Sequence, residues 1–548
     1  MSNRSFTIEG NLVDPWKKQI YPAEISVKEG KISAIRRKEG VGATGGFILP
    51  GFTDSHVHVE SSMLVPSEFA RLAVVHGTVA TVSDPHEIAN VCGIDGINFM
   101  IDNGRKVNFK FNFGAPSCVP ATIFETAGDA IDSAAVTALL ARPEIRYLSE
   151  MMNFPGVLNN DPEVMKKIAA AHKAGKPVDG HAPGLRGETA ARYIAAGIST
   201  DHECFTSEEA LDKLSGGMHI LIREGSAARN FDALIGLLPD HPEKIMFCSD
   251  DKHPDSLVAG HINRLCERAM ARGIDIFDII QAACINPVLH YGLPVGLLRE
   301  GDPADFIIAA DLVHFNILAT YINGEKVAEN GHSFIPSVDI TPVNRFHCAA
   351  VSASQLAIPV GSYPEADGKI PVIGALDGQL ITSKLWQEAH PVNGEWTTSL
   401  GSDRLKMVVI NRYHPAPPAA CFITAFGFRR GAIASSVAHD SHNIVAVGTD
   451  DESIARAINL VIREKGGVSC VDGKEEKVLG LPVAGLMSAD DGYRVATAYT
   501  AIDAMAKNLG SRLSAPFMTL SFMALLVIPH IKLSDKGLFD GDTFSLMN

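Results

Sequence analysis

The chain has 548 residues, of which 46% are hydrophobic and 20% charged, a composition typical of a globular enzyme with a sizeable core. Its length corresponds to roughly three or four domain-sized units, or fewer if one of them is a large barrel. The formal net charge is −15 without a long basic run, which argues against nucleic acid as a general partner and favours a small-molecule ligand.

Short strands and turns are expected in two separate segments, residues 1–49 and residues 301–335. Both contain β-rich runs, such as RSFTIEGNLVD in the first and DFIIAADLVHF in the second. YINGEKV predicts a hairpin, because Asn323-Gly324 is a preferred two-residue turn. Since these segments flank a long middle region, we expect them to combine into one small β-sandwich.

Residues 50–300 alternate between strand-like and helix-like patterns. Eight apolar, β-rich runs occur here, and each is followed by a helical pattern such as PSEFARLAVVHG or DPEVMKKIAAAHKAGK. The predicted strands cover 52–58, 77–84, 109–116, 144–150, 176–181, 197–202, 219–225 and 244–250. This alternation predicts an α/β fold, specifically a (β/α)8 TIM-like barrel.

Residues 340–548 are predicted to form a separate C-terminal α+β domain. Strands are expected in RLKMVVINRY, CFITAFGF, GAIASSVA and NIVAVGTD. DESIARAINLVIREKGG predicts an amphipathic helix, with Asp450 or Asp451 as its N-cap and Gly466-Gly467 as its stop. The stretch FIPSVDITPVNRF is the expected linker to this domain.

A cytoplasmic location is expected. MSNRSFTIEGNL has no apolar core of the kind found in signal peptides, and FMTLSFMALLVIPHI is too short to span a bilayer and is broken at Pro529. The nine cysteines include no C-x-x-C pair, which argues against a disulfide framework or a zinc ribbon. Free thiols in a reducing compartment are therefore expected.

Metal-binding side chains stand at the ends of most of the predicted barrel strands. His56 and His58 are two residues apart at the end of a strand and so project to the same side. Further candidates follow the later strands: Asp84, His86, Glu150, His181, His202 and Asp250. Because strand ends meet at one rim of a barrel, they predict a metal centre there. Imidazole and carboxylate without thiolate suit zinc, manganese or iron, and this many ligands suits two ions that share a carboxylate.

The motif PGFTDSHVH, the later histidines and ACINPVLHYGLPVGLLREGDPADFIIA resemble the amidohydrolase superfamily. Within it, HVHVESSM, SDPHEIANV, SEMMNFPGV, DGHAPGL, TDHECF, FCSDD and HDSHNIVAVG are similar to the bacterial adenine deaminase family. The resemblance covers essentially the whole chain. It implies hydrolytic deamination of adenine to hypoxanthine and ammonia, in purine salvage or catabolism, at a binuclear centre.

The resemblance also implies which residue holds which ion. His56, His58 and Asp250 are similar to the ligands of the first ion, and His181 and His202 to those of the second. Many superfamily members bridge the ions with a carboxylated lysine; Glu150 stands at that place here. The expected cofactors are two divalent ions per chain, Mn²⁺ or Fe²⁺ with Zn²⁺ as the alternative, and a homo-oligomer, a dimer, is expected.

The expected mechanism uses a metal-activated hydroxide that adds to the ring carbon carrying the amine. Asp250 is placed to accept a proton from the nucleophile and to return it to the leaving amine. Asp84 and His86 are candidates for a second proton relay or for a substrate contact. Against this, Asp84-Pro85 before HEIANV is also a plausible helix cap with proline in the first position.

Other interpretations stay open. A cyclic-amide hydrolase of the dihydroorotase or hydantoinase type would share the barrel and both ions, but the absence of a lysine at the fourth strand counts against it. An inactive metal-binding scaffold is a further alternative. His58-Val59-Glu60 is half of the signature of zinc-dependent base deaminases, but P-C-x-x-C is missing. Finally, His439 and His442 either reach the barrel mouth or belong to a polar turn.

Overall fold

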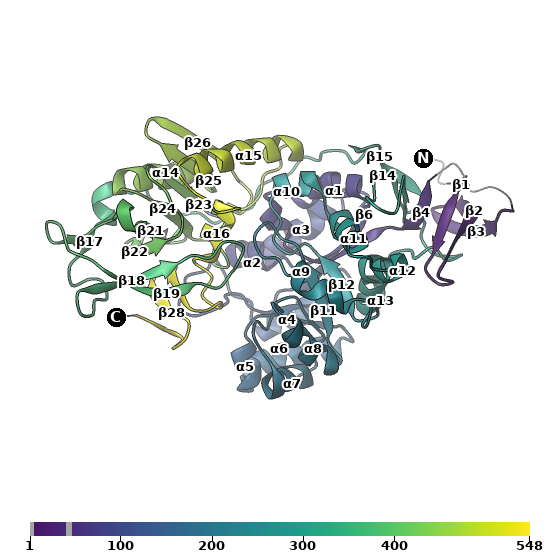
Figure 1. Cartoon of the computed structure of the whole chain (residues 1–548), viewed down its shortest axis with the longest axis horizontal. Coiled ribbons are helices and arrows are strands. Elements are labelled where there is room, and N and C mark those ends of the chain that lie inside the picture. Colours follow the sequence, from purple (N-terminus) through teal and green to yellow (C-terminus); the bar gives the residue numbers. More distant parts are fainter. Residues whose placement is uncertain (1–4, 40–45, 548) are drawn as a thin grey trace.

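The computed structural model describes residues 5–39 and 46–547. Figure 1 shows three regions side by side: the amino-terminal strands at one end, the C-terminal domain at the other, and the segment of parallel strands between them. Among the described residues, no helix is both long enough and apolar enough to cross a membrane.

The two β-rich end segments form one continuous sheet, in the order β16-β15-β14-β13-β4-β1-β2-β3. The sheet curls around its own apolar core, so that the ring of Phe6 lies 5.4 Å from that of Tyr321. The predicted hairpin is confirmed, with positive φ at Asn323 and Gly324 as its turn requires. The strands are β1 (Phe6–Asp14), β2 (Gln19–Lys28), β3 (Lys31–Arg37), β4 (Phe47–Pro50), β13 (Phe306–Ala309), β14 (Ile317–Ile322), β15 (Glu325–Glu329) and β16 (His332–Ser333).

The middle region contains a strand in each of the eight predicted places, paired in parallel as β5-β6-β7-β8-β9 and β10-β11-β12. Hydrogen bonds connect the two sheets at both sides: Ser199 N–H to Val178 O (2.9 Å), and Asp250 N–H to His56 O (2.9 Å). The parallel sheet is therefore strongly curled. The strands are β5 (Phe52–Val57), β6 (Thr78–Ser83), β7 (Lys110–Ala115), β8 (Ile145–Met151), β9 (Val178–Gly180), β10 (Thr200–Asp201), β11 (His219–Arg223) and β12 (Ile245–Cys248).

Helices cover the outside of these strands, and α6 shows why they form where they do. Asp161 caps it by accepting from the backbone N–H groups of Glu163 and Val164, and Pro162 fills the first position. The helices are α1 (Pro66–Ala73), α2 (His86–Cys92), α3 (Ile94–Gly104), α4 (Ser133–Leu140), α5 (Phe154–Leu158), α6 (Pro162–Lys173), α7 (Gly187–Ala195), α8 (Ser207–Ser215), α9 (Phe231–Leu234), α10 (Pro254–Ala259), α11 (Ile262–Ala271), α12 (Ile276–Ile280) and α13 (Asn286–Tyr291).

The C-terminal region is built on an eight-stranded sheet in the order β19-β18-β22-β21-β24-β23-β25-β26. Its strands are β18 (Lys369–Gly374), β19 (Ser383–Glu388), β21 (Leu405–Ile410), β22 (Ala419–Thr424), β23 (Ala432–Ser435), β24 (Ile444–Gly448), β25 (Gly467–Asp472) and β26 (Glu475–Gly480). The remaining elements are β17 (Ile358–Pro359), β20 (Glu395–Trp396), β27 (Ile531–Ser534), β28 (Gly537–Asp540), β29 (Ser545–Leu546), α14 (Asp451–Arg463), α15 (Gly492–Asn508) and α16 (Pro516–Phe522).

The two faces of this sheet pack against different partners. Side chains alternate along a strand, so Val408 and Ile410 of β21 pack with α14, while Met407 and Val409 point the other way. Met407 and Val409 join a large apolar core that includes α16 and continues into the region of parallel strands. The C-terminal domain therefore shares a core with the middle region.

Polar contacts also fix the C-terminal domain on the middle region. The backbone N–H of Gly492, at the start of α15, donates to Glu68 of α1 (3.0 Å), and Arg71 pairs with Asp491 at the same distance. Figure 1 shows α15 running from the C-terminal domain toward α1 and α10. This docking places segments of the C-terminal domain over the carboxyl ends of the parallel strands.

The N-cap of α14 gives a stability test. Asp450 Oδ1 accepts from Ser453 N–H (2.8 Å), which identifies Asp450 rather than Asp451 as the cap. Asp450→Ala should lower the free energy of unfolding by about 0.5–2 kcal/mol, because the first backbone N–H groups lose their acceptor. Urea denaturation followed by circular dichroism measures this. Asp450→Asn retains a capping oxygen and should remain close to wild type; an unchanged Asp450→Ala variant would contradict the assignment.

Candidate metal centre

The carboxyl ends of the parallel strands bring all of the predicted metal ligands into one buried cluster. None of them is more than 5% exposed. They come from five strands: His56 and His58 from the end of β5, Glu150 from β8, His181 from just after β9, His202 from just after β10, and Asp250 from just after β12. The curled sheet thus turns positions spread over almost 200 residues of sequence into one rim.

His56, His58 and Asp250 form the first group of ligand atoms. The Nε2 atoms of the two histidines are 3.2 Å apart, and Asp250 Oδ1 lies 3.7 Å from His56 Nε2 and 3.4 Å from His58 Nε2. Burial lowers the pKa of His56 well below its usual value, so this imidazole is neutral, the form that binds metal. Two ring nitrogens and a carboxylate oxygen converging in this way fit a divalent cation.

The backbone around Asp250 is held by the opposite strand. Asp250 has a φ of 53°, in the left-handed region that few residues other than glycine adopt. Its N–H donates to His56 O (2.9 Å), and its carbonyl accepts from His58 N–H (3.3 Å). The same strand end therefore fixes both the histidines and the aspartate.

Glu150 lies between the first group and a second one. Its Oε1 is 3.3 Å from His58 Nε2, while its Oε2 is 2.8 Å from His181 Nδ1 and 3.1 Å from His202 Nε2. Burial alone would raise the pKa of Glu150, but the imidazoles of His181, His202 and His58 hold it well below its usual range. The Glu150 carboxylate thus has one oxygen turned toward each group.

The chemistry of the facing atoms fits a cation in this cluster. His56 Nε2 and His58 Nε2 face each other at 3.2 Å, and Glu150 Oε2 lies 2.8 Å from His181 Nδ1 and 3.1 Å from His202 Nε2. Imidazole nitrogens and carboxylate oxygens this close together can share a divalent ion. The donor set is imidazole and carboxylate without thiolate, which fits divalent ions of the zinc, manganese and iron type.

Two members of the cluster, Arg223 and Glu203, escaped the sequence analysis. Arg223, the last residue of β11, pairs with Glu203 and donates to Asp250 Oδ2 (2.6 Å). Glu203 also lies 3.4 Å from His202 Nε2. Arg223 lies near the end of the seventh predicted strand, 219–225, much as the predicted ligands lie at the ends of theirs. Arginine does not bind metals, so a pattern of metal ligands does not include it.

The N-cap of α2 is Pro85, without a side-chain cap bond, and Asp84 instead bonds to His86 through both carboxylate oxygens. Asp84 Oδ1 accepts from the backbone N–H of His86 (3.1 Å) at the start of α2, and its Oδ2 lies 3.0 Å from His86 Nδ1. The capping interpretation had expected Pro85 in the first position of the helix. Pro85 instead precedes the helix, which begins at His86. The Asp84 carboxylate fixes the imidazole, whose Nε2 points away and has no hydrogen-bond partner among the described residues.

The loop from Val437 to Asn443 of the C-terminal domain reaches the mouth of the site. This is the first of the two alternatives predicted for His439 and His442; the other was a polar turn. His439 Nδ1 and His442 Nε2 each bond one oxygen of Glu87, in α2. Burial lowers the pKa of His439, but Glu87 and Asp251 outweigh it and raise the pKa to about 9. A buried, charged hydrogen-bond pair therefore fastens the loop to the start of α2.

Residues of the C-terminal domain close a small cavity above the metal ligands. Its outer wall includes Leu380, Phe522 and Leu525, together with His439 and Asp440 of the loop. The buried amine of Lys532 donates to the carbonyls of Leu380 (2.6 Å) and Phe522 (2.8 Å), and so holds two of these wall residues. The space next to the ligands is thus enclosed by both domains.

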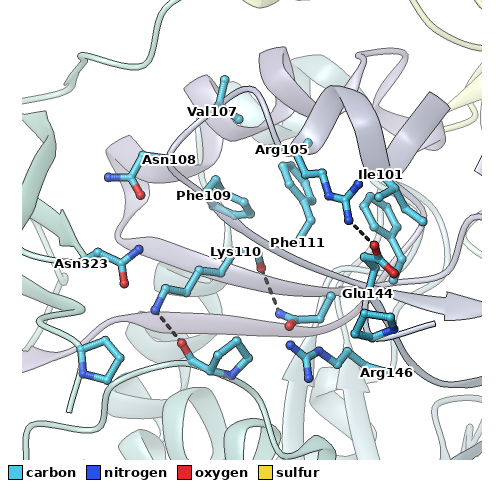
Figure 2. Close-up of a pocket in the computed structure, with 16 residues that line it drawn as sticks. Ile101, Arg105, Val107, Asn108, Phe109, Lys110, Phe111, Glu144, Arg146 and Asn323 are labelled. Atoms are coloured by element: carbon cyan, nitrogen blue, oxygen red, sulfur yellow. Dashed lines mark hydrogen bonds and ion pairs between the residues drawn. The ribbon is translucent and has the colours of Figure 1, made fainter. Parts of the chain in front are cut away.

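A larger groove, of about 620 Å³, lies at the opposite, amino-terminal ends of β7 and β8. Figure 2 shows Lys110 reaching across it, with the amine donating to Pro294 O, and Arg105 paired with Glu144. None of the predicted metal ligands lines it. In a parallel sheet of this kind, catalytic residues lie at the carboxyl ends of the strands. We therefore do not assign a reaction to this groove at the amino-terminal ends.

Two family models and several relatives match the chain. A model of the amidohydrolase family matches residues 47–327, and one of the adenine deaminase C-terminal domain matches residues 379–545. An adenine deaminase of Sulfurovum sp. (strain NBC37-1) is 52% identical over 99% of both chains, and one of Salinibacter ruber is 53% identical with the same coverage. An adenine deaminase of Methanosarcina acetivorans is 52% identical over 98% of both chains.

Glu87 offers a test of how the loop is fastened. Glu87→Gln keeps the shape but removes the charge that pairs with His439, and breaking a buried ion pair costs roughly 3–5 kcal/mol. Hydrogen exchange of a peptide covering 437–443 should accelerate at least about tenfold, since 1.4 kcal/mol corresponds to a factor of ten. Glu476→Gln, which removes an exposed pair with Arg456, is the control. Equal exchange in both variants would rule out the fastening role.

Proposed function

Since the chain belongs to the adenine deaminase family of amidohydrolases, we propose that its strand-end centre hydrolyses adenine to hypoxanthine and ammonia. The observation that carries the proposal is the buried Glu150 carboxylate, with one oxygen turned toward each group of imidazoles. The similarity to adenine deaminases covers essentially the whole chain, including the C-terminal domain that closes the cavity.

The proposed ligands of the first ion are His56, His58 and Asp250, and those of the second are His181 and His202, with Glu150 between the ions. The distances within each group support this division. Mn²⁺ or Fe²⁺ is the proposed metal, with Zn²⁺ as the alternative. Bound divalent ions would supply a nucleophile by lowering the pKa of coordinated water toward neutrality.

Proton transfer is assigned to residues of the chain itself. Asp250 Oδ1 accepts a proton from the attacking water and returns it to the departing amine, while Arg223 on Oδ2 keeps this carboxylate ionised and oriented. His86, held by Asp84 through Nδ1, presents Nε2 to the cavity. It serves as the second relay, to a nitrogen of the substrate ring.

The finer architecture also belongs to the proposal. A (β/α)8 barrel over residues 50–300 is supported by the hydrogen bonds that join β9 to the start of β10 and β5 to the segment after β12. The proposed domains are a small sandwich from 1–49 and 301–335, this barrel, and a C-terminal α+β domain from 340–548. A homodimer in the cytoplasm remains the prediction from sequence.

The alternatives are less well supported by the site. A hydantoinase- or dihydroorotase-like enzyme is expected to carry a lysine at the end of the fourth strand, where this chain has Glu150. An inactive scaffold is expected to have lost ligands, and the burial and short mutual distances of the predicted ligands count against it. Ammonia release from adenine distinguishes both alternatives from the proposal.

The substrate prediction is tested by loading the full-length protein with Mn²⁺ and assaying ammonia release from adenine, cytosine and hydantoin. Adenine alone should react. Removing the metal with a chelator should abolish turnover, and adding Mn²⁺ back should restore it, because the strand-end histidines have no other means of activating water. A fully loaded protein that releases no ammonia from adenine would refute the functional proposal.

Glu150 is tested through metal content. Glu150→Gln preserves the shape but removes the negative charge between two dications, whose mutual repulsion is then uncompensated. Metal content should fall from two ions toward one per chain, and turnover should be largely lost while the thermal midpoint of the metal-free protein stays close to wild type. Glu188→Gln, on an exposed position of α7, is the control. Two tightly bound ions and a normal rate in Glu150→Gln would place the shared ligand elsewhere.

A further inference from the structure

The outer wall of the cavity contains a carboxylate that the proposed mechanism does not use. Asp440, in the loop fastened to Glu87, is 3% exposed and lines the cavity together with the metal ligands. Its Oδ1 is 3.6 Å from His86 Nε2, beyond hydrogen-bond distance, and its Oδ2 has no hydrogen-bond partner among the described residues. A buried carboxylate oxygen without a hydrogen bond costs free energy, so Oδ2 is free to accept one from a bound ligand.

The position of Asp440 indicates which end of a substrate it would meet. His86 Nδ1 is 3.4 Å from Glu150 Oε1, and His86 Nε2 is 3.6 Å from Asp440 Oδ1. Asp440 therefore lies one imidazole ring beyond the carboxylate at the metal centre. When the amine-bearing carbon of a purine is at that centre, the five-membered ring extends away from it by a similar length. The ring N–H of the free base is on that five-membered ring.

We infer that Asp440 is the residue that recognises the free base, by accepting a hydrogen bond from the ring N–H of the purine's five-membered ring. The inference rests on the proposed function and specifies how its substrate is selected. A purine carrying a substituent on that nitrogen has lost the donor, and the substituent would meet the loop. The C-terminal domain thus contributes base-versus-nucleoside specificity in addition to closing the site.

The contacts of the neighbouring residues support a binding wall rather than a further metal site. One ligand atom each of His86, Glu87 and Asp440 lies within 4.8 Å of the other two, close enough for a cation. However, both oxygens of Glu87 already accept hydrogen bonds from His439 and His442. The other atoms without a hydrogen-bond partner, His86 Nε2 and Asp440 Oδ2, belong to residues that line the cavity next to the metal ligands, where the proposed function places the substrate.

Calorimetry on the manganese-loaded, full-length protein tests the inference without depending on turnover. The probes are purine, which lacks the reacting amine, and 9-methylpurine, which also lacks the ring N–H. Wild type should bind purine at least about tenfold more tightly, because a hydrogen bond to a charged group contributes roughly 1.5–3 kcal/mol. Equal affinities would overturn the inference even if adenine is deaminated.

Variants separate recognition from a structural role. In Asp440→Asn and Asp440→Ala, the Kd for purine should rise roughly 10–100-fold, and the kcat/KM preference for adenine over 9-methyladenine should shrink at least tenfold. Glu475→Gln, an exposed carboxylate of the same domain, is the control and should behave like wild type. An equal loss on both substrates would show that Asp440 only supports the wall. Loss of one bound metal ion per chain would show that it holds a cation instead.

A wild type that releases no ammonia from adenine but prefers purine over 9-methylpurine would refute the proposed function and leave the role of Asp440 intact. A wild type that deaminates adenine but shows no preference between the two probes would refute the role of Asp440 and leave the proposed function intact. The two failures are therefore distinguishable in one set of preparations.

Discussion

Glu150 is an ionised carboxylate buried among imidazoles, with Oε1 3.3 Å from His58 and Oε2 2.8 Å from His181. Two divalent ions a few ångströms apart repel strongly, and an anion between them is the simplest way to hold both. The proposed pair of ions would therefore account for the architecture around Glu150. The strands β5, β8, β9, β10 and β12 must end at one level, and the sheet must curl until the segment after β12 bonds to β5.

The C-terminal domain encloses the cluster that lies at the carboxyl ends of the parallel strands. Its loop is fastened to Glu87 by two histidines, and the buried amine of Lys532 holds the carbonyls of two wall residues. These contacts, together with the core shared by the two domains, leave the strand-end cluster enclosed by residues from both. Water-excluded surroundings strengthen every electrostatic interaction inside, which is an advantage for a centre that depends on charge.

Much of this arrangement can be predicted from sequence, because it depends on local patterns. The strands of the middle region show as apolar runs, and a parallel α/β sheet places their ends together, so the order of residues alone is enough to group His56, His181 and Asp250. The part that sequence missed depends on long-range contacts. Arg223 and Glu203 matter only because they meet Asp250 and His202, and nothing local in HILIREG marks that pairing. The loop with His439 can be noticed, but its partner Glu87 lies about 350 residues away.

The most direct test of the central claim is anomalous X-ray diffraction from crystals of the manganese-loaded protein. Two manganese peaks should lie on either side of the Glu150 carboxylate, about 3.5–4 Å apart as in other two-metal sites, with His56, His58 and Asp250 around one and His181 and His202 around the other. A single peak, or two peaks of which neither contacts Glu150, would contradict the account.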